Sequence, residues 1–118
     1  MPATRFVIRV YHRVPVRCDL YYMGQEFLGK GMVVNVSRNG FRALGDCYVV
    51  PGLELIARLS LPQGGGSVDI QCAVVRWVRG LWFGAKILKL NPKAEERIGT
   101  FLRERLRECH HLPCAVRR

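Results

Sequence analysis

The sequence predicts a mainly β chain, a six-stranded antiparallel barrel followed by a C-terminal α-helix. Apolar side chains recur with period two through most of residues 15–90, and turn-forming residues interrupt this alternation at intervals. After Asn91 the spacing of apolar residues changes to three and four, which is typical of an amphipathic helix. A series of short strands joined by turns favours an antiparallel barrel.

The strand pattern is clearest between Leu53 and Leu61, where every second residue is apolar. Such alternation indicates a strand with one buried face. Further strands are expected near residues 15–23, 26–36, 41–44, 68–79 and 82–90. The turn signals that separate them are Gly24-Gln25, Asn39-Gly40, Pro51-Gly52, Gly64-Gly65-Gly66 and Arg79-Gly80.

The last element is expected to be a helix from about Pro92 to Cys109. Asn91 is a favourable N-cap, and proline suits the first helical position. Gly99 should cost this helix about 1 kcal/mol relative to alanine. The apolar face, which we expect to pack on one end of the barrel, is formed by Ala94, Ile98, Phe101, Leu102, Leu106 and Cys109.

The length of 118 residues fits one domain, residues 1–118, with its core at about 9–108 and mobile ends at 1–4 and 112–118. No run of about 18 uncharged apolar residues is present, and the N-terminus lacks the apolar stretch of a secretory signal. The five cysteines form no CxxC pair, so reduced and mostly buried thiols are expected. These features predict a cytoplasmic protein without a membrane span.

The net charge of +10 favours an anionic partner such as a phosphodiester, a nucleic acid or an acidic lipid, although a solvated basic face would have the same composition. Residues 1–45 contain seven Arg and Lys residues against only two carboxylates. No catalytic residues are predicted, because the carboxylates are scattered and His12 has no nucleophile at a suitable spacing. No metal site is predicted either, since adjacent histidines such as those in Cys109–Cys114 rarely reach one zinc ion.

Near the N-terminus, an arginine recurs at every fourth position. Arg5, Arg9, Arg13 and Arg17 form three overlapping RxxxR pairs, so the spacing alone does not select one of them. A guanidinium group presents a rigid fork of donors that can pair with guanine O6 and N7 or grip a phosphate, and its flat face can stack on a purine. The alternative is that these arginines are exposed charges that pair with surface carboxylates.

A second polar segment, Asn35-Val-Ser-Arg-Asn-Gly40, lies between two expected strands. If residues 35 and 37 point to one side of a strand, the Asn35 amide and the Ser37 hydroxyl project together. The amide offers a donor and an acceptor to a guanine edge, and the hydroxyl suits a phosphate or ribose oxygen. In the structural alternative, Asn39-Gly40 is an ordinary hairpin turn, and Asn35 and Ser37 bond local backbone.

The order of these two segments, with Val14-Pro15-Val16 directly after Arg13, resembles the PilZ domain, a family of bacterial receptors for cyclic di-GMP. The resemblance selects Arg9 and Arg13 as the arginine pair and matches the family pattern (D/N)xSxxG at Asn35, Ser37 and Gly40. It extends through Pro51-Gly52, Val74-Val75-Arg76-Trp77 and Phe83-Gly84-Ala85-Lys86-Ile87, and thus covers about residues 9–108.

The resemblance implies a six-stranded PilZ-like barrel that binds cyclic di-GMP and needs no cofactor. The ligand-binding residues would be Arg9, Arg13, Asn35, Ser37 and Gly40, with Arg5, Arg17, Arg38 and Trp77 as accessory candidates. Many members have a further arginine where this chain has Ile8, and that arginine is associated with a second ligand molecule, so one molecule is expected here. The implied role is to relay the messenger level to an unidentified protein in motility, adhesion or exopolysaccharide control.

Two other functions stay open at this point. A PilZ-fold adaptor would act through protein contacts and bind no nucleotide, although such members usually lack both motifs. A basic barrel with exposed aromatic residues could instead bind single-stranded nucleic acid. For both Trp77 and Trp82, core packing or hairpin pairing is a commoner role than stacking on a base.

Overall fold

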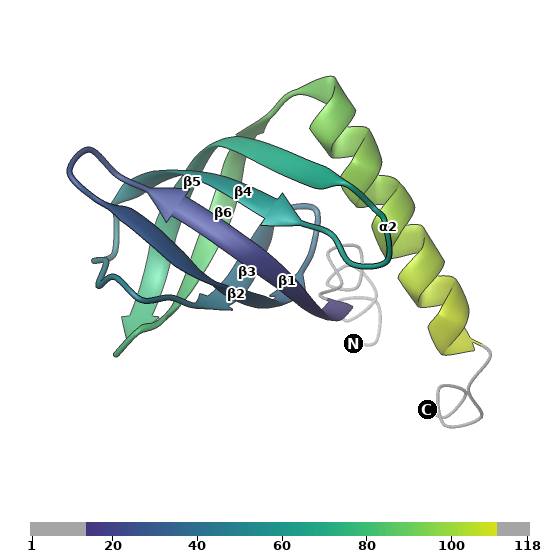
Figure 1. The fold of residues 1–118 in the computed structure, drawn as a ribbon, viewed down its shortest axis with the longest axis horizontal. Coiled ribbons are helices and arrows are strands. Elements are labelled where there is room, and N and C mark those ends of the chain that lie inside the picture. Colours follow the sequence, from purple (N-terminus) through teal and green to yellow (C-terminus); the bar gives the residue numbers. More distant parts are fainter. Residues whose placement is uncertain (1–13, 111–118) are drawn as a thin grey trace, which may run out of the picture.

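The computed structural model describes the chain from residue 14 to residue 110, and its side chains from 16 to 105. Within this range six antiparallel strands form a closed barrel, and one helix lies beside its end (Figure 1). The order around the barrel is β1-β2-β3-β6-β5-β4, and β1 pairs with β4 to close it. The fold class predicted from the sequence is confirmed. The ends expected to be mobile, residues 1–4 and 112–118, lie outside the described range.

The strand boundaries agree with the sequence pattern to within about two residues. The largest difference is at the start of the second strand, because Gln25 and Glu26 belong to the turn that the Gly24 N–H closes on the Phe27 carbonyl. The strands are β1 (Val14–Met23), β2 (Leu28–Val36), β3 (Gly40–Leu44), β4 (Glu54–Ser60), β5 (Ser67–Arg79) and β6 (Trp82–Leu90).

The core fills the interior of the barrel, because alternate side chains of every strand point inward. On β4 the buried residues are Leu55, Ala57 and Leu59, which lie on the apolar face that the sequence predicts. Removing a side chain of this kind from water contributes roughly 1.5–3 kcal/mol. The outer face is therefore left to polar and partly exposed residues, and it is the surface available for a ligand.

Tyr22 links the core to the loop that follows β3. Its hydroxyl donates to the Cys47 carbonyl oxygen and accepts from the Cys47 N–H, both at 2.9 Å. Its ring contacts Phe27 and Phe83, with centroids 5.9 and 5.2 Å away. Burial raises the pKa of Tyr22, so the hydroxyl keeps the proton that it donates. One buried side chain thus satisfies both backbone groups of Cys47.

The helix α2 (Pro92–His110) begins as the sequence predicts, since Asn91 Oδ1 accepts the Ala94 N–H at 2.7 Å. Ala94, Ile98 and Leu102 bury their side chains in the core. Figure 1 shows α2 running past the end of the barrel where β1 begins and β4 ends. The side chains of Leu106 and Cys109 lie outside the described residues. No helix in residues 14–110 is both long and apolar enough to span a membrane.

The three described cysteines are free thiols, but only Cys18 is buried as expected. Burial raises the pKa of the Cys18 thiol to about 11, and Arg105 lowers it by a smaller amount. Cys47 and Cys72 are partly exposed, so the expectation of buried thiols is wrong for these two. The segment Cys109–Cys114, weighed above as a metal site, has no described side chains.

We predict that Tyr22→Phe lowers the free energy of unfolding by about 1–3 kcal/mol, because it leaves the partly buried Cys47 N–H and carbonyl oxygen without their partner. Urea denaturation followed by circular dichroism measures the change. Tyr21→Phe is the matched control, since Tyr21 is 43% exposed and should change stability by less than about 0.5 kcal/mol. Equal stability of Tyr22→Phe and the wild type would contradict the role assigned to the hydroxyl.

Candidate ligand-binding site

A row of four residues crosses the outer face of the barrel, one from each of four strands. The backbone register pairs Asn35 with Arg42, Arg42 with Gly84, and Gly84 with Trp77. Directly opposed residues in neighbouring strands have Cβ atoms about 4.5–5.5 Å apart. The row therefore brings Asn35 and Trp77, which are 42 positions apart in the sequence, onto one surface with Arg42 between them.

Asn35 reaches this outer surface because of an irregularity in β2. Val33 and Val36 both point into the core, although strict alternation would send residues three apart to opposite faces. The register shifts between Val33 and Asn35, which leaves Val34 as an extra residue. Such β-bulges redirect side chains and are common next to functional sites.

A second irregularity acts on Trp77. The register of β5 against β6 shifts between Val75, which pairs with Ala85, and Trp77, which pairs with Gly84. Arg76 is the extra residue, so Arg76 and Trp77 follow one another on the outside of the barrel. Both ends of the row thus depend on a bulge in the strand concerned.

Asn35 has an unused acceptor. Its side-chain oxygen Oδ1 is buried and, among the residues that the structure describes, has no hydrogen-bond partner. A buried polar atom without a partner costs about 1–3 kcal/mol. Val14 pairs with Val36, so the chain enters β1 next to this amide, and Arg13 is the residue bonded to Val14. A donor that approaches from outside the described residues would satisfy Oδ1.

Ser37 has the local structural role that the sequence left open. Only 3% of it is exposed, and its Oγ lies 3.4 Å from the Gly40 carbonyl oxygen and accepts the Asn39 N–H at 3.2 Å. The Ser37 N–H also donates to the Gly40 carbonyl at 2.8 Å, which closes the turn. Ser37 is also one of the residues that line the surface hollow described below.

Gly40 is needed for close packing rather than for a left-handed backbone. Neither Asn39 nor Gly40 has a positive φ, in contrast to a hairpin turn that requires one. A Cβ at position 40 would lie 2.5 Å from the Ala85 carbonyl oxygen on β6. The Asn39 carbonyl accepts the Ile87 N–H at 2.7 Å, which fixes the turn against the same strand.

Gly84 lets the Trp77 side chain lie across β6. A Cβ at position 84 would collide with Nε1, Cε2 and Cδ1 of the indole. The ring extends toward Arg42, whose Cζ lies over the rings of Trp77 and Trp82, 5.7 and 5.1 Å from their centroids. Contacts of this kind are favourable cation–π interactions. Trp77 therefore does not pack in the core, and its role is not limited to pairing with the neighbouring strand.

A shallow hollow of ≈300 Å³ lies beside the indole. It contains two basic side chains and no acidic one, which favours an anion. The indole adds a flat apolar wall that suits a nucleobase. The lining residues are Ser37, Asn39, Gly40, Arg76, Trp77, Gly84, Ala85 and Lys86.

The remaining residues expected at the site are distributed as follows. Arg5, Arg9 and Arg13 lie outside the described residues. Arg17 is exposed on β1. Arg38 lies over α2 rather than in the hollow, since a Cβ at Gly99 would stand 3.0 Å from its Nη2.

Sequence reasoning missed four contributors to this surface, which are Arg42, Arg76, Gly84 and Lys86. Only Gly84 carried a local signal, because a glycine inside a strand often marks a close approach of another group.

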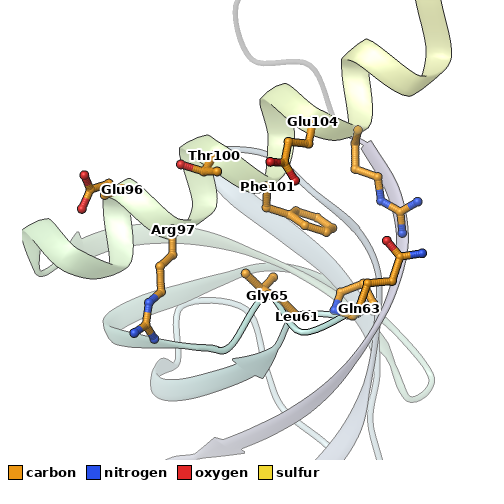
Figure 2. Close-up of a pocket in the computed structure, with 10 residues that line it drawn as sticks. Leu61, Gln63, Gly65, Glu96, Arg97, Thr100, Phe101 and Glu104 are labelled. Atoms are coloured by element: carbon orange, nitrogen blue, oxygen red, sulfur yellow. The ribbon is translucent and has the colours of Figure 1, made fainter. Parts of the chain in front are cut away.

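A second hollow, of ≈280 Å³, lies between α2 and the loop that joins β4 to β5. Figure 2 shows Phe101 pointing toward the barrel and Arg97 reaching from α2 toward this loop. Arg97 Nη1 donates to the Ser67 carbonyl at 2.6 Å, so this cation is already bound. The carboxylates of Glu96 and Glu104 also line the hollow. An anionic ligand is better accommodated beside Trp77.

A family model for the PilZ domain matches residues 8–104, most of the chain. The chain belongs to the PilZ domain family. Both the resemblance stated from the motifs and the PilZ-like barrel are thereby confirmed. No curated protein sequence is significantly similar to the chain.

Solved structures with a similar fold include the following three. The isolated PilZ domain of YcgR from Escherichia coli, with c-di-GMP, has a TM-score of 0.65 at 12% identity over 86% of this chain and 93% of that chain. YcgR from Escherichia coli in complex with c-di-GMP has a TM-score of 0.69 at 15% identity over 86% of this chain and 47% of that chain. The Bacillus subtilis inhibitor of motility, MotI/DgrA, has a TM-score of 0.67 at 17% identity over 83% and 51%. This chain thus spans about half the length of the last two, and identities this low show the fold alone.

We predict that Gly84→Ala in this PilZ domain displaces the Trp77 indole, because the added methyl group occupies its place. Stability should fall by about 1–3 kcal/mol, the usual cost of inserting a methyl group into a packed site. In a Trp82→Phe background Trp77 is the only tryptophan, so its fluorescence maximum reports the displacement and should move to longer wavelength. An unchanged maximum and unchanged stability relative to Trp82→Phe alone would contradict the contact.

Proposed function

We propose that this PilZ domain is a non-catalytic receptor for cyclic di-GMP. The observation that carries the proposal is the row on the outer face, where a buried acceptor on Asn35, a guanidinium group and an indole lie side by side. This surface combines the groups that bind a nucleobase with a basic hollow that suits a phosphate. The c-di-GMP present in two of the similar YcgR structures supports the same ligand.

The binding groups would come from two parts of the chain. The barrel supplies Asn35 and the turn from Ser37 to Gly40, which are fixed by backbone hydrogen bonds before the ligand arrives. The segment before Val14 supplies Arg9 and Arg13, and it joins the barrel beside Val36. Arginine contacts from this segment to phosphate and guanine would complete the site.

The ligand would bind as a single molecule. Ile8 provides no guanidinium group at the position that would precede the arginine pair. The hollow beside Trp77 is also small, at ≈300 Å³, and has a single indole wall. We propose a stoichiometry of one cyclic di-GMP per chain.

The receptor would act in the cytoplasm on another protein. The turn that holds Ser37 touches α2 through Arg38 and Gly99, so a change in the turn would reach the helix surface. We propose that the N-terminal segment, once it contacts the ligand, and this helix contact together present an altered surface to a protein partner. A partner that controls motility fits the description of MotI/DgrA as an inhibitor of motility.

Calorimetric titration with cyclic di-GMP tests the receptor function. The wild type should bind one molecule, and Arg13→Ala should weaken binding roughly tenfold to a hundredfold if Arg13 makes a bidentate contact. Arg103→Ala, which removes an exposed arginine from α2, is the matched control and should bind as the wild type does. Unchanged affinity in Arg13→Ala would remove this residue from the site. No binding by the wild type at high micromolar ligand would favour an adaptor without a nucleotide ligand.

The salt dependence of affinity separates a dinucleotide receptor from a nucleic-acid-binding barrel. Two phosphates release few counterions, so the logarithm of the binding constant should fall with a slope no steeper than about −2 against the logarithm of salt concentration. Titrations between low and moderate salt measure this slope. A slope several times steeper with single-stranded polynucleotide, together with displacement of cyclic di-GMP by that polymer, would support nucleic acid as the true ligand.

A further inference from the structure

Arg42 lies over two aromatic rings on the outer face of the barrel. Its neighbours Phe41 and Ala43 are fully buried, so Arg42 projects outward from β3. Its guanidinium group contacts the rings of Trp77 and Trp82, one from each neighbouring strand. Two aromatic contacts restrict a side chain that is otherwise among the most flexible in proteins.

The donors of this guanidinium group are unused. In the part of the chain that the structure describes, the Arg42 side chain has no hydrogen bond and no carboxylate partner. Arg58 provides a contrast on another part of the outer face, since its Nε donates to Asp69 Oδ1 at 2.6 Å. The aromatic rings cover only the flat face of a guanidinium group, so the N–H donors at its edge stay available to a ligand.

The position of Arg42 over Trp77 leaves room for a base on the same ring. Cζ is 5.7 Å from the ring centroid, which exceeds the separation of about 3.5–4 Å between stacked groups, so the guanidinium group is not in van der Waals contact with the centre of the ring. A base stacked on the ring would lie next to the guanidinium group, and its edge would come within reach of the Arg42 donors. Donors that turn into the plane of the base would form a bidentate arginine–guanine pair.

We infer that Arg42 recognises the O6 and N7 edge of a guanine stacked on Trp77 and so selects guanine over adenine. The inference rests on the proposed cyclic di-GMP receptor function and names the residue that determines its specificity. Guanine presents two acceptors on this edge, and both accept a donor from the guanidinium fork. Adenine presents an amino group in place of O6, which opposes a donor to a donor and leaves part of the fork unpaired.

Binding of cyclic di-GMP and cyclic di-AMP to wild type and variants tests this inference. Each unlabelled dinucleotide displaces a fluorescent cyclic di-GMP from the wild type, Arg42→Ala and Arg42→Lys. We expect Arg42→Ala to bind cyclic di-GMP roughly tenfold to a hundredfold more weakly and to change little toward cyclic di-AMP. Arg42→Lys keeps the charge and a cation over the indoles but has no planar fork, so it should lose most of the guanine preference as well.

Arg79→Ala is the matched control. Arg79 is an exposed arginine opposite Trp82 in the strand register, so its substitution removes the same charge from the same face. It should retain the wild-type preference. Equal weakening of both dinucleotides by Arg42→Ala, or full guanine preference in Arg42→Lys, would overturn base recognition by Arg42. Wild-type affinity in Arg42→Ala would overturn it too. A wild type that binds no dinucleotide would refute the proposed function itself, which distinguishes the two failures.

Discussion

Gly84 determines what the outer face of this barrel can hold. A Cβ at this position would occupy the space of the Trp77 indole, and the ring could then no longer extend across β6 toward Arg42. The lack of a side chain also weakens a strand interior, which is the usual cost of glycine in a sheet. Here the closed barrel compensates, since β6 is paired on both sides, with β3 and with β5. A single glycine thus allows an aromatic ring to cover part of the strand surface.

The bulges at Val34 and Arg76 make the rest of the site possible. Each turns one side chain from its expected direction, and together they place Asn35 and Trp77 at opposite ends of the same row. The interior loses nothing by this, because Val33, Val36 and Val75 remain buried. Stability therefore comes from the inner face, and the outer face can hold polar, cationic and aromatic groups.

The sequence predicted the strands and the helix well, because alternation and the Asn91 cap are local signals. It did not predict the row, since cross-strand neighbours depend on register, and an inserted residue such as Val34 has no distinctive side chain. Ser37 shows the same limit, because only the folded turn brings its hydroxyl beside the Asn39 N–H. The family resemblance pointed to Asn35, Ser37 and Gly40, whereas Arg42 became visible only between its two indole neighbours.

The most direct test of this account is a ¹H–¹⁵N correlation spectrum of the chain titrated with cyclic di-GMP. The two indole N–H signals are assigned with Trp77→Phe and Trp82→Phe. The account predicts large shifts for the Trp77 indole, the Asn35 side-chain amide and the Gly84 amide, with small shifts for residues of the opposite outer face such as Ile56. Saturable shifts centred on Ile56 or on the α2 hollow around Phe101, with the Trp77 indole unmoved, would contradict it.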